Sequence, residues 1–337
     1  MHTRFGVLAA CLAAVGLATV MACGPASKEA RAADSRGDAP RKTAWGHPDL
    51  QGTYTTNEAN GVAFERPAEF GNTAELGPEE CRKWKAESEQ QVRERVTAGT
   101  GNGPAHWYEW WNRDSCRTSL VIEPADGRIP WRPGATKGTT LGRGGVEGDA
   151  LPASWLDLKA FDRCLTRGLP IVMVPQAYNA GLQIFQTPDA VAIHYEMVHE
   201  VRVIPLDGSP HVDGRIGQWM GDSRGRWDGN TLVVDVTNFT EKANGTLIPA
   251  GSYAGGGTTM HMVERFTPIG RDRIEYTATI EDPQQFSAPW TISIPVVRDE
   301  NYRIFEYACH EGNYAMGNIL RGARAQERKG SAVPAGR

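Results

Sequence analysis

Two His-Glu dipeptides, His199-Glu200 and His310-Glu311, are the residues of this chain best suited to acid–base chemistry. A neutral imidazole can take up or release a proton near neutral pH, and a carboxylate can orient it. Each pair stands at the end of a run of β-forming residues, and neighbouring residues on a strand point to opposite faces. We therefore predict His310, His199 and Glu311 as candidate catalytic residues. A histidine that only caps the rim of the fold is the alternative.

A second group of residues is suited to binding a small molecule. Arg224 carries a planar guanidinium that can grip a carboxylate, or it can hold a hairpin together through an ion pair with Asp222. The aromatic run at residues 106–111 offers flat surfaces for an apolar ligand, or a lid packed on the fold. The predicted ligand-binding residues are Trp110, Trp111, Tyr178, Arg224, Trp227, Asn313 and Tyr314.

Nucleophilic and metal chemistry have weaker support. Residues 221–225, Gly-Asp-Ser-Arg-Gly, satisfy the serine-hydrolase pattern, but that motif needs a turn from a strand into a helix, and here a hairpin follows. His194 and His199 are an odd number of residues apart, so on one continuous strand they would not share an ion. A site built from His199, His261, His310 and a carboxylate is the alternative. We predict neither a metal nor a cofactor.

The cysteines predict two disulfide bonds. Two of the six lie in or at the end of an expected leader, and the other four form no Cys-x-x-Cys motif. In an oxidising compartment four cysteines allow three pairings. We predict Cys164–Cys309, because a short helix that ends at Cys164 must return to the last strong strand, and, as the second pair, Cys81–Cys116.

The N-terminus is typical of an exported lipoprotein. A short positive start is followed by apolar and small residues, as in a signal peptide over residues 1–22. Val20-Met21-Ala22-Cys23 resembles the lipobox of bacterial lipoproteins, in which the cysteine is lipidated, with ordinary cleavage as the alternative. Residues 23–44 have the composition of a flexible tether. We predict a periplasmic protein anchored to the outer membrane through lipidated Cys23.

Charge and composition limit the remaining partners. The formal net charge of −4 offers no basic field, so we expect no binding to nucleic acid. The N-terminal lipid is the one membrane contact that we expect. Ten tryptophans and 38 glycines suggest a β-rich secreted protein with many turns. The sequence predicts no particular oligomeric state.

The elements that must position these residues are mainly strands. Turn residues separate segments of alternating apolar and polar side chains, and no strand–helix–strand alternation appears. We predict a single domain over residues 45–325 and a disordered tail over 326–337. The fold would be an antiparallel meander closed into a lipocalin-like barrel or strongly curved sheet, with one or two peripheral helices at 78–96 and 155–167. The expected strands are 171–174, 182–186, 191–198, 201–205, 231–239, 260–266, 273–281, 290–296 and 302–308.

Four motifs together resemble an uncharacterised family of exported β-rich bacterial proteins. The resemblance covers residues 45–324 and implies a shared fold and a shared site, with no activity attached. The motifs are Arg-Thr-Ser-Leu-Val at 117–121, Arg-Cys-Leu-Thr-Arg-Gly-Leu-Pro at 163–170, Trp-Met-Gly-Asp-Ser-Arg-Gly-Arg-Trp at 219–227 and Cys-His-Glu-Gly-Asn-Tyr at 309–314.

The leading functional hypothesis is an exported, lipid-anchored β-barrel protein that binds a small apolar or aromatic molecule at the barrel mouth. We expect the site where His310, Asn313 and Tyr314 meet the segment 219–227 and the aromatic run 107–111. The alternative is a cofactor-independent lyase, isomerase or hydrolase that uses acid–base residues at the same mouth. A structural envelope protein with a filled interior is the third hypothesis.

Overall fold

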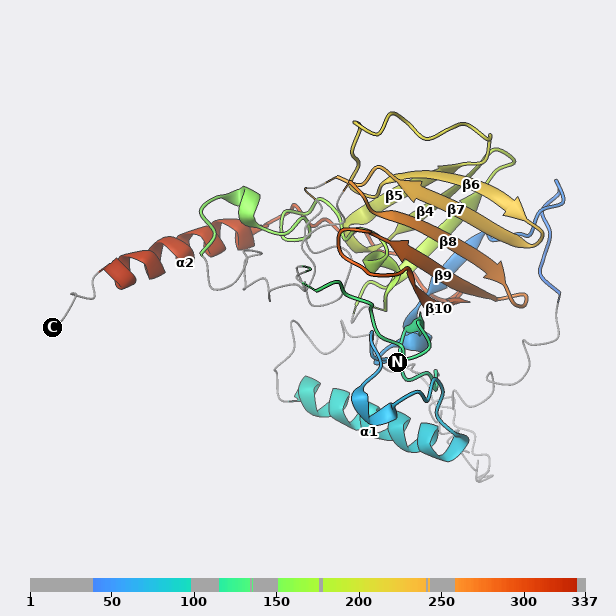
Figure 1. Cartoon of the computed structure of the whole chain (residues 1–337), viewed down its shortest axis with the longest axis horizontal. Helices are drawn as coiled ribbons and strands as arrows, with labels where there is room; N and C mark the ends of the chain where they lie inside the picture. Colours follow the sequence, from blue (N-terminus) through green and yellow to red (C-terminus); the bar gives the residue numbers. More distant parts are fainter. Residues whose placement is uncertain are drawn as a thin grey trace, which may run out of the picture. The chain divides into compact units, whose positions relative to one another are not determined.

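Antiparallel strands form one strongly curved sheet, which is nearly closed into a barrel (Figure 1). The computed structural model describes residues 39–97, 115–133, 135, 151–175, 178–240, 242 and 258–331. The strand order is β5-β4-β3-β1-β10-β9-β8-β7-β6, and β2 pairs with β10 beside this path. The strands are β1 (Gly52–Thr55), β2 (Val121–Glu123), β3 (Gly181–Gln186), β4 (Ala190–Tyr195), β5 (Glu200–Pro205), β6 (Asp222–Asp228), β7 (Thr231–Thr237), β8 (His261–Pro268), β9 (Arg273–Glu281) and β10 (Trp290–Arg298).

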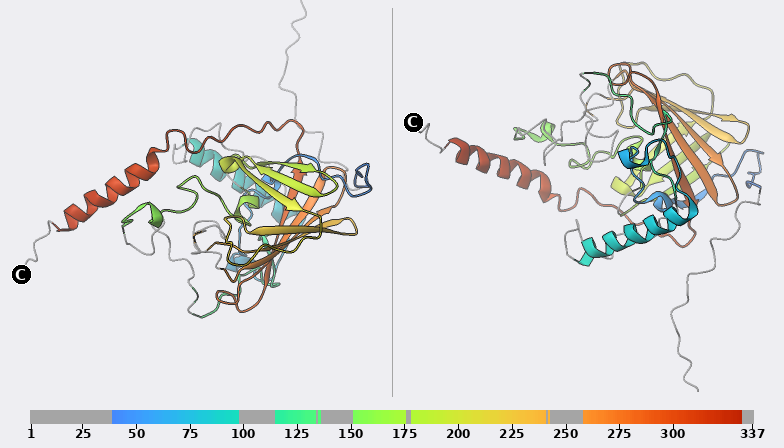
Figure 2. Two further views of the ribbon diagram at one scale, coloured as in Figure 1. Left: turned by 90° about the horizontal axis from the view of Figure 1, so that it is seen from above. Right: turned by 60° about the horizontal axis from the view of Figure 1, so that its bottom comes forward.

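The alternating sequence pattern decides which side chains fill the barrel. In β9, Ile274, Tyr276, Ala278 and Ile280 are buried, and the residues between them face outward. The inward-facing residues of the neighbouring strands join them in one apolar cluster. Burial of each large apolar side chain contributes about 1.5–3 kcal/mol, so this shared face stabilises the sheet. Figure 2 shows the curved sheet from two further directions.

The two edge strands, β5 and β6, close the barrel through side chains. A Cβ atom on Gly225 of β6 would lie 2.7 Å from Ile204 of β5, so glycine permits the close approach. Buried Arg202 of β5 donates through Nε to Ser223 Oγ at 2.9 Å and through Nη1 to Glu264 Oε1 at 3.0 Å. Burial lowers the pKa of Arg202, but the Glu264 carboxylate outweighs that effect and holds the pKa above its usual value.

Both ends of the barrel are covered by irregular chain. At the end where β5 begins, Leu169, Ile171 and Met173 are buried in the core cluster. At the opposite end, buried Leu50 donates its backbone N–H to Gln186 Oε1 at 3.0 Å, and the ring of His47 stacks on Trp227 at 4.9 Å. Side chains therefore fill the barrel over the described residues.

Two α-helices lie at the periphery, α1 (Pro78–Thr97) and α2 (Tyr314–Ser331). The Cys81–Cys116 disulfide joins α1 to the chain before β2, and Arg324 of α2 donates to the carbonyls of Pro152 and Ala153. Neither helix is long and apolar enough to span a membrane, a finding limited to the described residues. Short 3₁₀ helices occur at Asn57–Ala59, Ala68–Phe70, Trp155–Asp157, Ile171–Met173 and Met197–His199.

The fold class and both disulfide pairings predicted from the sequence are confirmed, and the Cα atoms of Cys164 and Cys309 lie 5.6 Å apart. Several local predictions are wrong. Residues 302–308 form no strand, the expected strand at 171–174 is a 3₁₀ helix, and 155–167 contains only a single 3₁₀ turn. Strand β6 and helix α2 were not expected, and α2 continues through residues 326–331, which were predicted to be disordered.

Candidate functional site

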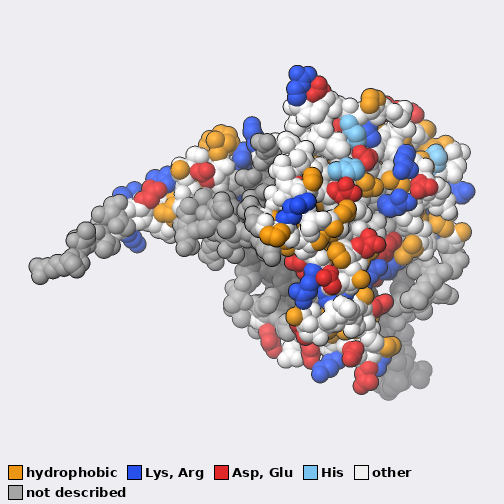
Figure 3. Space-filling view, in the orientation of Figure 1, with side chains coloured by type: hydrophobic (Ala, Val, Ile, Leu, Met, Phe, Trp, Pro, Cys, Tyr) orange, Lys and Arg blue, Asp and Glu red, His pale blue; other side chains and the backbone are white. Residues whose placement is uncertain are grey.

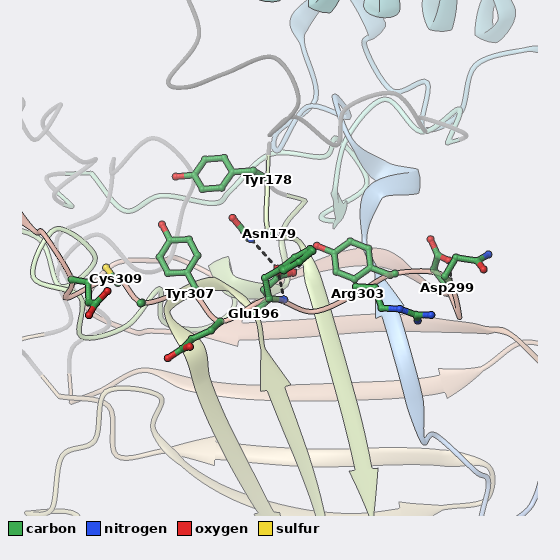
Figure 4. Close-up of a pocket in the computed structure, with 13 residues that line it drawn as sticks. Tyr178, Asn179, Glu196, Asp299, Arg303, Tyr307 and Cys309 are labelled. Atoms are coloured by element: carbon green, nitrogen blue, oxygen red, sulfur yellow. Dashed lines mark hydrogen bonds between the residues drawn. The ribbon is translucent and has the colours of Figure 1, made fainter. Parts of the chain in front are cut away.

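A pocket of about 1030 Å³ lies beside the ends of β3 and β4, where the segment that follows β10 crosses them (Figure 4). The two sides of the pocket come from residues far apart in the sequence. A glutamate between β4 and β5 lies at its base. The lining residues are Tyr178, Asn179, Glu196, Asp299, Asn301, Tyr302, Arg303, Phe305, Glu306, Tyr307, Ala308, Cys309 and Glu311.

The carboxylate of Glu196 fixes the crossing segment in place. Glu196 is fully buried and accepts hydrogen bonds from Asn179 Nδ2 at 2.9 Å, from Tyr302 Oη at 2.6 Å and from the backbone N–H of Phe305 at 3.1 Å. A buried carboxylate needs such donors, because an unsatisfied buried charge is costly. Glu196 therefore joins the start of β3 to the segment after β10 and sets the shape of the pocket.

Gly181, the first residue of β3, permits this arrangement. A Cβ atom there would lie 2.2 Å from Tyr302 Cε1 and 2.8 Å from Glu196 Oε2. The tyrosine ring thus rests directly against the backbone of the strand. This requirement for a glycine arises from close approach of side chains rather than from an unusual backbone angle.

Four aromatic rings face this pocket. Phe305 has 68% of its surface exposed, more than any other large hydrophobic side chain of the described residues except Tyr314. Tyr178 and Tyr307 lie near each other in Figure 4 and share a hydrogen bond. Burial, the nearby Tyr178 and that hydrogen bond raise the pKa of Tyr307, so the Tyr307 hydroxyl is neutral at ordinary pH. The lining offers apolar ring faces together with hydroxyl groups.

Three of the four sequence motifs meet next to the pocket. The Cys164–Cys309 disulfide joins the motif at 163–170 to the motif at 309–314, and Asn313 Nδ2 donates to Cys164 Sγ at 3.3 Å. Thr166 Oγ1 lies 3.4 Å from Met220 Sδ, which brings the motif at 219–227 to the same place. Segments far apart in the sequence therefore build one end of the barrel.

The predicted residues at 310–314 are distributed around this region. Glu311 lines the pocket, as does Tyr178. His310 is exposed, and its carbonyl accepts the backbone N–H of Asn313 at 3.4 Å. Tyr314 is 75% exposed at the start of α2. The side-chain amide of Asn313 donates to the carbonyl of Asp162 and to Cys164 Sγ, so it contacts the chain just before the Cys164–Cys309 disulfide. Neither His310 nor Tyr314 is among the residues that line the pocket.

Arg224 and Trp227 contact other parts of the fold. Arg224 Nη1 donates to Asp222 Oδ1 at 2.9 Å and its Nε to the carbonyl of Pro210 at 2.9 Å, which matches the ion-pair alternative. Trp227 stacks on His47. Trp110, Trp111 and the rest of the aromatic run at 106–111, like Cys23, lie outside the described residues.

The expectation that His194 and His199 point to opposite faces is wrong. β4 ends at Tyr195, and the 3₁₀ turn Met197–His199 folds the chain back before β5. The two imidazoles therefore meet edge to face, with ring centroids 5.2 Å apart. Burial and the neighbouring His199 lower the pKa of His194, against the opposing effect of Glu196.

Ser223, the serine of the Gly-x-Ser-x-Gly pattern, lies within β6 and is 3% exposed. Its hydroxyl accepts a hydrogen bond from Arg202, and β6 is followed by a hairpin rather than a helix. This is not the strained strand-to-helix turn that a hydrolase nucleophile needs. Its contacts therefore favour a role in closing the barrel.

A chain of histidines and carboxylates crosses the outer face of β6, β7 and β8. The two ring nitrogens of His211 lie 2.8 Å from Asp222 Oδ2 and 2.8 Å from Asp235 Oδ1, and His261 Nε2 lies 2.8 Å from Asp235 Oδ2. Both contacts of His211 are hydrogen bonds only when its ring is protonated, because a carboxylate accepts and does not donate. Figure 3 shows histidine and acidic side chains together on this face. Over the described residues, no three His, Cys, Asp or Glu side chains form a group that could hold a metal ion.

No protein-family model matches the chain, and a comparison with curated proteins found no significant similarity. The resemblance of the four motifs to an exported bacterial family stays a prediction.

Sequence reasoning missed most of the polar base of the pocket. Glu196, Asn179 and Tyr302 belong to no motif, and Glu196 and Tyr302 are 106 positions apart in the sequence. One signal was available: β3 begins at a glycine, Gly181, and a glycine in a strand often marks a close approach by another segment. The identity of that segment does not follow from the sequence pattern.

Proposed function

We propose that this protein binds a small molecule with an aromatic or apolar body in the pocket at Glu196. The observation that carries the proposal is the exposed ring of Phe305, held over the pocket by a hydrogen bond from its own backbone to a buried carboxylate. Exposure of so large an apolar ring costs free energy that a bound ligand would recover. The tyrosine rings beside it provide further contact area for a flat ligand.

The position of the pocket differs from that expected for a lipocalin-like binder. Buried apolar side chains, together with the buried Arg202–Glu264 pair, fill the barrel over the described residues, so the proposed ligand lies beside the strand ends and not inside. A volume of about 1030 Å³ is at the upper end of the range for small-molecule sites. The proposal includes export and anchoring through Cys23, which rest on the N-terminal sequence alone.

An enzyme is the second candidate, and the contact between Tyr302 and Glu196 favours it. A tyrosine hydroxyl 2.6 Å from a carboxylate inside a pocket has the geometry of an acid–base pair. Such a pair would suit a lyase, isomerase or hydrolase that needs no cofactor. Because the Glu196 carboxylate already accepts three hydrogen bonds, it is less available to exchange a proton with a substrate. Ligand binding is therefore the leading proposal.

Mass spectrometry of small molecules retained through purification tests the proposal. Protein purified under native conditions is denatured, and the released compounds are compared with those from a Phe305→Ala variant. We expect an aromatic or apolar compound in the wild-type sample that is depleted in the variant. Equal amounts in both samples would contradict the proposed site. An enzyme would instead convert the retained compound on incubation, and a Tyr302→Phe variant would not.

A further inference from the structure

The charges around the pocket indicate which class of ligand it accepts. The described residues of its lining carry four carboxylates and one guanidinium, hence a formal charge of −3. Glu306 and Glu311 are exposed, and Arg303 is exposed and donates to the carbonyl of Glu300 at 3.1 Å. Charges of one sign around a concave surface attract ligands of the opposite sign.

Among the described residues, the buried carboxylate at the base has no lysine or arginine as an ion-pair partner. All three donors to Glu196 are neutral, namely an amide, a hydroxyl and a backbone N–H. In the part of the chain that the structure describes, no lysine or arginine lies within ion-pair distance of Glu196. A buried charge without a counter-charge is costly, so a positive group in the pocket would interact favourably with it.

The aromatic rings add a second attraction for a positive group. The faces of Tyr178, Tyr302, Phe305 and Tyr307 carry partial negative charge, and a cation within about 6 Å of a ring centroid is attracted to it. Arg167 interacts with Tyr178 and Tyr307 but does not line the pocket. Burial lowers the pKa of Arg167, while the two tyrosines and Asp162 oppose that effect.

We infer that the ligand is an organic cation, with an amine or quaternary ammonium group on an aromatic or apolar body. The inference rests on the proposed function, because it concerns the same pocket. The carboxylates and the ring faces both favour a positive group. Among the described lining residues, an anion would meet one cation, Arg303, and would be repelled by four carboxylates.

Three ligands of matched size test the inference: 2-phenylethylamine, 2-phenylethanol and phenylacetate. Dissociation constants are measured by titration calorimetry on the purified full-length protein in detergent, at low and at high salt. We expect the amine to bind at least about fivefold more tightly than the alcohol, and phenylacetate to bind least. The preference for the amine should decrease at high salt, because salt screens exposed charges.

Two double variants, each lacking two carboxylates, test whether the preference for the amine arises in the pocket. In Glu306→Gln/Glu311→Gln the ratio of alcohol to amine dissociation constants should fall toward one. In Glu69→Gln/Glu75→Gln, which removes two exposed carboxylates outside the lining, the ratio should stay at the wild-type value. Equal binding of amine and alcohol by the wild-type protein, or tighter binding of phenylacetate, would overturn this inference alone. Failure of all three ligands to bind would overturn the proposed function as well.

Discussion

Tyr302 Oη donates a 2.6 Å hydrogen bond to Oε2 of Glu196, a fully buried carboxylate. This contact holds the segment after β10 against the ends of β3 and β4. Replacing Tyr302 with phenylalanine keeps the ring and removes the donor. We expect the free energy of unfolding to fall by about 1.5–3 kcal/mol, as for other hydrogen bonds to charged groups. Urea denaturation measures the change, with Tyr314→Phe, on a 75% exposed ring, as control. A loss below about 0.5 kcal/mol would show that the contact is not maintained in solution.

Gly181 provides an independent test of the same packing. Gly181→Ala places a methyl group 2.2 Å from the ring of Tyr302, so the ring must move or the strand must shift. We expect destabilisation of about 1–3 kcal/mol, typical of overpacked sites. Gly214→Ala is the matched control, because a Cβ atom there meets no atom within 4 Å. Equal stability of the two variants in thermal unfolding would contradict the close approach of Tyr302.

The contacts of Asp235 predict a dependence of stability on acid. Burial raises the pKa of Asp235, but hydrogen bonds from His261 and His211 outweigh burial and hold the pKa below its usual value. A lowered folded-state pKa gives a stabilisation that is present above about pH 4 and is lost as the pH falls through the folded-state value. The stability difference between wild type and Asp235→Asn should therefore shrink as the pH falls from 5 to 2.

Chemical denaturation across this pH range measures that difference. The variant Asp189→Asn, at an exposed turn position, gives the background effect of removing one carboxylate. A difference for Asp235→Asn that grows toward low pH, or that matches the background at every pH, would show that the histidine contacts do not hold Asp235 ionised.

Anchoring through Cys23 is tested by changing the cysteine to serine. If Cys23 carries the lipid, Cys23→Ser should move the protein from the detergent phase to the aqueous phase, because the lipid supplies the membrane affinity. Phase partitioning of cell extracts measures this, with Cys11→Ser, in the apolar part of the expected leader, as the control. Retention of the Cys23→Ser protein in the detergent phase would contradict the lipoprotein hypothesis.

The sequence predicted the strands correctly where apolar and polar residues alternate regularly. Alternation in β9, from Ile274 to Ile280, has period two and needs no tertiary information. Four cysteines left three pairings, and the pairing chosen is the one that forms, although the helix before Cys164 and the strand before Cys309 that were expected do not form. The pattern failed at β6, whose inward positions hold Ser223, Gly225 and Trp227, because closure of the barrel there uses a polar contact and a close approach instead of apolar burial.

The site was harder to predict than the fold. Cys309 and Glu311 line the pocket, but Arg224 and Trp227, chosen for their chemistry, make contacts elsewhere. Side-chain chemistry shows what a residue can do, while the partner that it meets depends on the path of irregular chain. The crossing of residues 299–311 over β3 and β4 is such a path, and no local pattern specifies it.

The most direct test of the proposed site compares two exposed phenylalanines. Phe305 is 68% exposed in the lining of the pocket, and Phe185 is 50% exposed on β3 outside it. Titration calorimetry with 2-phenylethylamine should give a dissociation constant about fivefold higher for Phe305→Ala than for the wild type, since the loss of one aromatic contact costs about 1 kcal/mol. Phe185→Ala should bind like the wild type. Unchanged binding by Phe305→Ala, or an equal loss in both variants, would contradict a ligand site at Glu196.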